Sequence, residues 1–156
     1  MIFISPTKGK MTLEQVSRDL AGFVQANPES SFKLIVGTDS QIREEVCYVT
    51  AIIILREGKG GRFYYAKEYE GIKPSLKERI FYEASKSLQI AAELTRYLAV
   101  TEVASLDVEI HLDVGVHGKT KDIIREVVGM VTGSGFDAKI KPMAYGASKV
   151  ADKYTK

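Results

Sequence analysis

The spacing of hydrophobic residues changes character along the first half of the chain. Apolar side chains recur at helical spacing after Thr12, which forms a capping-box signature with Gln15, and Asn27-Pro28 ends the run. This pattern predicts an amphipathic helix. Three runs with strand character follow at residues 33–39, 46–55 and 62–69, and the glycine-rich residues 58–61 indicate a hairpin between the last two.

The second half of the chain alternates between helical and strand periodicity. Its spacing predicts helices over residues 75–100, 119–132 and 144–156, and strands over 108–113 and 136–141. An antiparallel meander followed by alternating helices and strands favours a mixed sheet covered on both faces. We therefore expect an α/β fold with a five-stranded mixed sheet, helices on both faces and a further helix at the N-terminus.

Length and composition restrict the class of protein. With 156 residues, 45% of them apolar, the chain can bury one sizeable core, so we expect a single domain over residues 1–156. No apolar stretch approaches the roughly 20 residues of a membrane span, and the N-terminus lacks the hydrophobic run of a secretory signal. Cys47 is the one cysteine and lies in an apolar run. We expect a cytoplasmic protein with no membrane partner, whose net charge of +2 permits a phosphate-bearing partner without requiring one.

A glutamate falls on the apolar side of the long predicted helix. At about 100° per residue, Glu83 lies within the stripe that faces the core. Burying an ionised carboxylate is costly unless a cation, hydrogen-bond donors or a metal compensate. The alternative is a glutamate at the edge of the helix that reaches water. The stripe consists of Leu76, Ile80, Ala84, Leu88, Ala91, Leu94 and Leu98.

Three aspartates add to this carboxylate. Asp39 and Asp113 each follow an apolar strand, and the carboxyl ends of strands are where ligand sites form in open α/β sheets, so the two could share a cation. Taken alone, Asp39 also fits an Asx-type turn and Asp113 a polar strand face. Asp152 lies in the last predicted helix, where its position alone indicates only a solvated residue.

Two further patterns point to other chemistry. Residues 118–120, Gly-Lys-Thr, resemble the end of a phosphate-binding loop but lack its upstream glycine, so we expect no ATP site. His111 and His117 are possible bases or metal ligands, although a histidine on a strand face or in a loop explains each as well.

Taken together, the four acids resemble a known arrangement. The order Asp39, Glu83, Asp113, Asp152 is similar to the four acidic positions of the ribonuclease H-like superfamily. Within it, residues 36–41, 111–115 and 147–153 resemble the small bacterial YkuK-type family. This resemblance implies a ribonuclease H-like core over residues 33–156, preceded by an N-terminal helical extension over residues 1–32.

The resemblance also implies an activity, namely a nuclease that hydrolyses phosphodiester bonds of RNA or DNA with two Mg²⁺ or Mn²⁺ ions. Asp39 would bridge both ions, Glu83 and Asp113 would each complete one side, and Asp152 would hold the second ion more loosely. The chain has no concentrated basic segment like the substrate-gripping extension of some ribonucleases H. Two alternatives stay open: a catalytically inactive nucleic-acid-binding or assembly protein, and a small-phosphoester hydrolase that uses Asp113 with His111 or His117.

Overall fold

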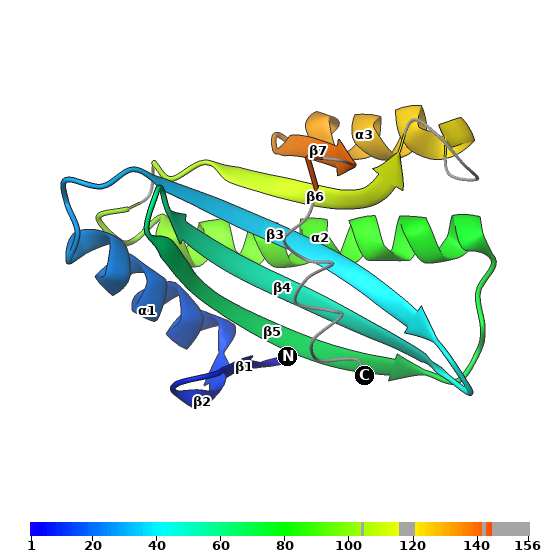
Figure 1. Ribbon diagram of the computed structural model, residues 1–156, viewed down its shortest axis with the longest axis horizontal. Helices are drawn as coiled ribbons and strands as arrows, with labels where there is room; N and C mark the ends of the chain where they lie inside the picture. The colour runs from blue at the N-terminus through cyan, green and yellow to red at the C-terminus, as the bar shows by residue number, and fades with distance from the viewer. Residues whose placement is uncertain (104, 116–120, 142, 145–156) are drawn as a thin grey trace.

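A seven-stranded mixed sheet organises the computed structural model, which describes residues 1–103, 105–115, 121–141, 143 and 144. Its order is β2-β1-β5-β4-β3-β6-β7. The centre is an antiparallel meander of β3 (Phe32–Ile42), β4 (Val46–Arg56) and β5 (Gly60–Glu70), whose strands pair along their whole length (Figure 1). Long β-branched and aromatic runs suit such central strands.

The two strands absent from the five-stranded prediction form an N-terminal hairpin. β1 (Ile2–Ser5) pairs with β2 (Gly9–Thr12), and β1 joins the sheet beside β5 through Ile4 and Tyr65. Gly9 adopts a φ of 75°, a left-handed conformation that glycine accepts without strain. The predicted strand count was therefore wrong, because strands of four residues contain too few alternations to stand out from an irregular terminus.

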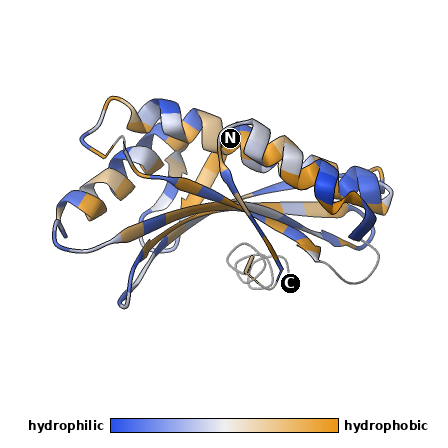
Figure 2. Ribbon diagram, turned by 90° about the horizontal axis from the view of Figure 1, so that it is seen from above, coloured by the Kyte–Doolittle hydropathy of each residue, from blue (hydrophilic) through white to orange (hydrophobic). Residues whose placement is uncertain are grey.

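Three helices cover one face of the sheet (Figure 2). They are α1 (Leu13–Gln25), α2 (Leu76–Leu98) and α3 (Ile124–Gly133), the last preceded by the short 3₁₀ helix η1 (Lys121–Ile123). Capping boxes at Thr12 and Ser75 start α1 and α2 where the sequence predicts. The predicted helix over residues 144–156 lies outside the described residues. No helix in the described part of the chain is long and apolar enough to cross a membrane.

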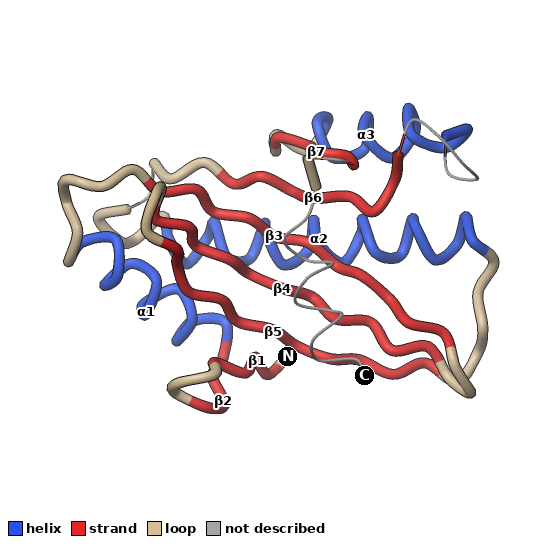
Figure 3. Tube along the Cα trace, viewed as in Figure 1, coloured by secondary structure: helices blue, strands red, loops and turns tan. Residues whose placement is uncertain are grey.

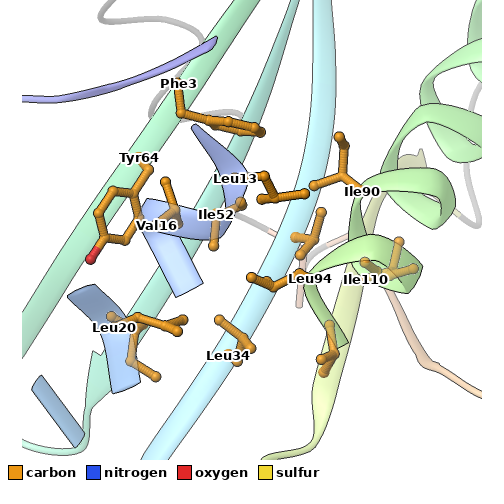
Figure 4. Packing of buried hydrophobic residues seen from close by; sticks show 14 of the residues in the cluster. Phe3, Leu13, Val16, Leu20, Leu34, Ile52, Tyr64, Ile90, Leu94 and Ile110 are labelled. Carbon is orange, nitrogen blue, oxygen red and sulfur yellow. The ribbon is translucent and has the colours of Figure 1, made fainter. Parts of the chain in front are cut away.

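The main core lies between the sheet and these helices (Figure 4). Alternate strand positions such as Leu34, Ile52 and Tyr64 face the helices and pack with Leu20 and Leu94. The intervening positions form a second, smaller apolar cluster on the opposite face, as the twofold alternation of a strand requires. Its buried members are Ile35, Cys47, Val49, Ala51 and Ile53.

The sheet divides beside its central strand. β6 (Val108–Gly115) runs parallel to β3 and is followed at the edge by β7 (Asp137–Lys141), also parallel. Pairing between β3 and β6 ends at Gly37 and His111, although both strands continue beyond these residues. Figure 3 shows the two strands separating toward their carboxyl ends. This separation opens the sheet at the place where the acidic residues lie.

Candidate metal centre

Asp39 and Asp113 lie on the two sides of the opening, each two residues beyond the last paired position. The sequence predicted that each residue ends its strand; instead β3 continues to Ile42 and β6 to Gly115, and only the pairing between them stops. Strand alternation places both side chains on the face away from the helices, because their neighbours Thr38 and Leu112 face α2 or the core.

Glu83 reaches the same opening from α2. The helix approaches β3 closely at small side chains, where the Oγ1 atom of Thr38 lies 2.9 Å from the Oγ atom of Ser87. One turn earlier, the Ser40 hydroxyl donates a hydrogen bond of 2.5 Å to Oε2 of Glu83. Glu83 is only 5% exposed, so the carboxylate that the helical periodicity places toward the sheet is indeed buried there.

Three of the four predicted acids therefore converge. Ligand atoms of Asp39, Glu83 and Asp113 all lie within 4.8 Å of one another. The backbone N–H of Ser40 donates to Oδ1 of Asp39 at 2.9 Å, a local contact that orients this carboxylate. Asp152, the fourth predicted acid, lies outside the described residues.

The ionised form of Glu83 is disfavoured in this cluster. Burial and, after it, the negative charges of Asp39 and Asp113 together raise the pKa of Glu83 to about 8, against the lowering effects of the Ser40 hydrogen bond and the Arg79 charge. Without a metal, Glu83 therefore holds a proton at neutral pH. A buried group that ionises with such difficulty identifies a place where a cation would be strongly favoured.

A lysine that the sequence did not single out contacts the cluster. The Nζ atom of Lys141, the last residue of β7, lies 2.5 Å from Oδ1 of Asp113. This contact depends on the parallel pairing of β7 with β6, which places Lys141 opposite Gly115. No short motif in the sequence marks such a residue, because its role follows from the register of the strands.

His111 contributes less to this centre than the three acids. His111 is buried, and its Nε2 atom lies 3.3 Å from Oε1 of Glu109 on the same strand. Burial lowers the pKa of His111, so the imidazole is neutral at physiological pH. This environment resembles that of a packed structural histidine more than that of an exposed base. His117 lies outside the described residues.

Comparison with known proteins agrees with this architecture. A family model described as Ribonuclease H-like matches residues 15–156. The chain belongs to the ribonuclease H-like family. Within that family it is similar to "Uncharacterized protein YkuK" of Bacillus subtilis (strain 168), with 36% identity over 168 residues that cover 99% of this chain and 97% of the relative. No solved structure matches. The predicted family and fold class are thus confirmed.

Proposed function

We propose that this protein is a divalent-metal-dependent nuclease that hydrolyses phosphodiester bonds of RNA or DNA. The observation that carries the proposal is the convergence of Asp39, Glu83 and Asp113 within 4.8 Å at an opening in the sheet. Membership of the ribonuclease H-like family supports a nucleic acid as the substrate. Fold alone does not determine chemistry, so the proposal rests on the acidic site.

The donor set fits Mg²⁺ or Mn²⁺. All three converging ligands are carboxylates, the hard oxygen donors that these cations prefer, and they come from separate elements rather than from one loop. The raised pKa of Glu83, caused first by burial, indicates that the described part of the chain does little to stabilise an ionised carboxylate at this position. Asp39, Glu83 and Asp113 would hold the metal, and Asp152 is the fourth ligand that the family resemblance implies.

The chain's own residues hold the ligands in place before substrate arrives. The bond between Ser40 and Glu83 and the contact between Thr38 and Ser87 fix the position of α2 relative to β3. Asp39 is held by a buried strand and by its bond from the Ser40 amide. Bound Mg²⁺ or Mn²⁺ would activate a water molecule and stabilise the leaving oxygen of the phosphodiester. Ligands mounted on packed elements limit the rearrangement that binding requires.

Cleavage assays on defined substrates test the proposal. Labelled RNA·DNA hybrid, single-stranded RNA and branched DNA are incubated with Mg²⁺, with Mn²⁺ and with chelator. We expect cleavage to require the metal and Asp39→Asn to abolish it while nucleic-acid binding is largely kept, because an amide is a poor ligand for a hard cation. The matched control is Asp107→Asn, an exposed acid just before β6, which should cleave like the parent.

Each other outcome identifies a different function. Activity that survives both the chelator and Asp39→Asn contradicts the metal mechanism. Binding of nucleic acid without cleavage of any substrate supports the inactive nucleic-acid-binding protein instead. Hydrolysis of small phosphoesters that is lost in His111→Gln or His117→Gln supports the hydrolase that uses a histidine.

A further inference from the structure

Lys141 approaches the acidic cluster from the side opposite α2. Its neighbour Ile140 packs against the main core, so strand alternation directs Lys141 to the face on which Asp39 and Asp113 lie. Its Nζ atom is 2.5 Å from Oδ1 of Asp113, while its side chain is still 54% exposed. A long side chain on an edge strand can therefore contact the site and also move away from it.

Lys141 interacts electrostatically with all three acids of the cluster. The hydrogen bond to Asp113 raises the pKa of Lys141, and the charges of Asp113, Asp39 and Glu83 raise it as well, although burial lowers it. The charge of Lys139, two residues earlier on the same strand face, instead lowers the pKa of His111. Lys141 forms an ion pair with Asp113, a member of the acidic cluster.

A divalent cation would compete with Lys141 for Asp113. The ammonium group and the divalent cation are both attracted to the carboxylate oxygens of Asp113, and the two positive charges repel each other at close range. A half-exposed ion pair is weak, so a metal entering the cluster can displace the lysine. The displaced ammonium remains tethered to the end of β7, beside the site, where it is suited to meet a phosphate as a compact positive charge.

We propose that Lys141 competes with the divalent cation for Asp113 and, once displaced, faces the phosphodiester of the nucleic-acid substrate, an inference that rests on the proposed function. Lys141 thus lowers the affinity of the site for metal and raises its affinity for substrate. A merely structural lysine would not produce these two opposite effects, because its loss would weaken both kinds of binding.

Titration with Mn²⁺, followed by electron paramagnetic resonance of the free ion, tests the first part. We expect Lys141→Gln to bind Mn²⁺ roughly 1.5-fold to fivefold more tightly than the parent, the range that loss of one exposed ion pair allows. Lys141→Arg, which keeps the charge, should resemble the parent. The matched control is Lys139→Gln, which should leave the Mn²⁺ affinity unchanged. Equal or weaker Mn²⁺ binding by Lys141→Gln would overturn the inference.

Steady-state cleavage at saturating Mn²⁺ tests the second part. We expect Lys141→Gln to raise KM for the nucleic acid several-fold, and Lys141→Arg to restore it. An unchanged KM overturns the role toward substrate. Tighter Mn²⁺ binding with no cleavage by any variant supports the competition at Asp113 and contradicts the proposed nuclease. Absence of Mn²⁺ binding in the parent and in Lys141→Gln contradicts both the metal centre and the competition.

Discussion

Two buried carboxylates on the helical face of the sheet have opposite surroundings. Asp19 on α1, whose side chain is 7% exposed, accepts a hydrogen bond of 2.5 Å from the Tyr64 hydroxyl and forms ion pairs with Lys8 and Arg62. Glu83 on α2 is a buried residue, whereas Asp19 as a whole residue is half-buried, and the neighbours of Glu83 include two further acids. Burial penalises both ionised groups; at Asp19 the neighbouring cations and hydrogen bonds outweigh this penalty, whereas at Glu83 the charge of Arg79 does not.

The pKa values of the two groups record this difference. Burial raises the pKa of Asp19, but hydrogen bonds from Lys8 and Tyr64 and the charges of Lys8 and Arg62 outweigh it, so the pKa is lowered overall. For Glu83, burial and the neighbouring acids prevail, and the pKa is about 8. Asp19 joins the N-terminal hairpin, α1 and β5, and so serves the fold. Glu83 destabilises the metal-free fold when ionised, which is expected of a ligand.

The largest expected effect is the pH dependence of stability in chelator. Because the pKa of Glu83 is raised from 4.5 to about 8 in the folded state, the stabilisation by its protonated form is complete below about pH 4.5 and is lost as pH rises through 8. The loss should amount to about 4 kcal/mol. Urea unfolding between pH 5 and 8.5 measures it. Glu83→Gln should remove the slope, and saturating Mg²⁺ should flatten it in the parent.

Glu93→Gln, a change on the same helix away from the acidic cluster, is the control and should keep the slope of the parent. A parent whose stability is constant across this pH range would show that Glu83 is already compensated, and the contrast with Asp19 would disappear.

A smaller effect is expected at the compensated carboxylate. Asp19→Asn leaves the buried Tyr64 hydroxyl and two cations with a weaker partner, so the free energy of unfolding at pH 7 should fall by about 2 kcal/mol. Because the folded-state pKa of Asp19 is lowered, its contribution in the parent is present above about pH 4 and is lost as pH falls below it. Thermal unfolding at pH 7 tests the loss of stability in Asp19→Asn, and thermal unfolding at pH 3 tests whether the contribution of Asp19 in the parent is lost.

The exposed pair of Glu14 and Arg18 on the same helix provides the comparison, because Glu14→Gln should cost less than about 0.5 kcal/mol. If Asp19→Asn cost no more than this surface change, the Asp19 cluster would not serve to hold the hairpin in place.

The smallest expected effect concerns the pKa of Glu83 itself. The Ser40 hydroxyl favours ionised Glu83 through a hydrogen bond, so Ser40→Ala should raise the pKa of Glu83 further and move the midpoint of its titration to higher pH. Carbon NMR of labelled glutamate side chains in metal-free protein follows this titration directly. A midpoint that stays in place or moves to lower pH would contradict the assigned role of Ser40.

The sequence predicted what depends on local periodicity. Helical spacing placed Glu83 toward the sheet, and the ends of apolar runs marked Asp39 and Asp113. It did not reveal Lys141 or the Asp19 cluster, because their contacts join segments that are far apart in the chain. Lys141 meets Asp113 only once β7 has paired with β6, and Lys8 meets Asp19 only once the hairpin has formed. Such contacts are determined by strand register and by the packing of distant segments against one another, and a short sequence pattern reveals neither.

The origin of the three acids in β3, α2 and β6 has a kinetic consequence. Asp39, Glu83 and Asp113 come together only after all three elements have docked, so the unfolded chain offers no comparable binding site. A divalent ion would therefore bind the native state selectively and act as a removable cross-link between distant parts of the chain. If the acids converge after the folding transition state, added ion slows unfolding and leaves the refolding rate unchanged. Unfolding and refolding rates measured with and without Mg²⁺ would then show whether the site forms before or after the folding transition state.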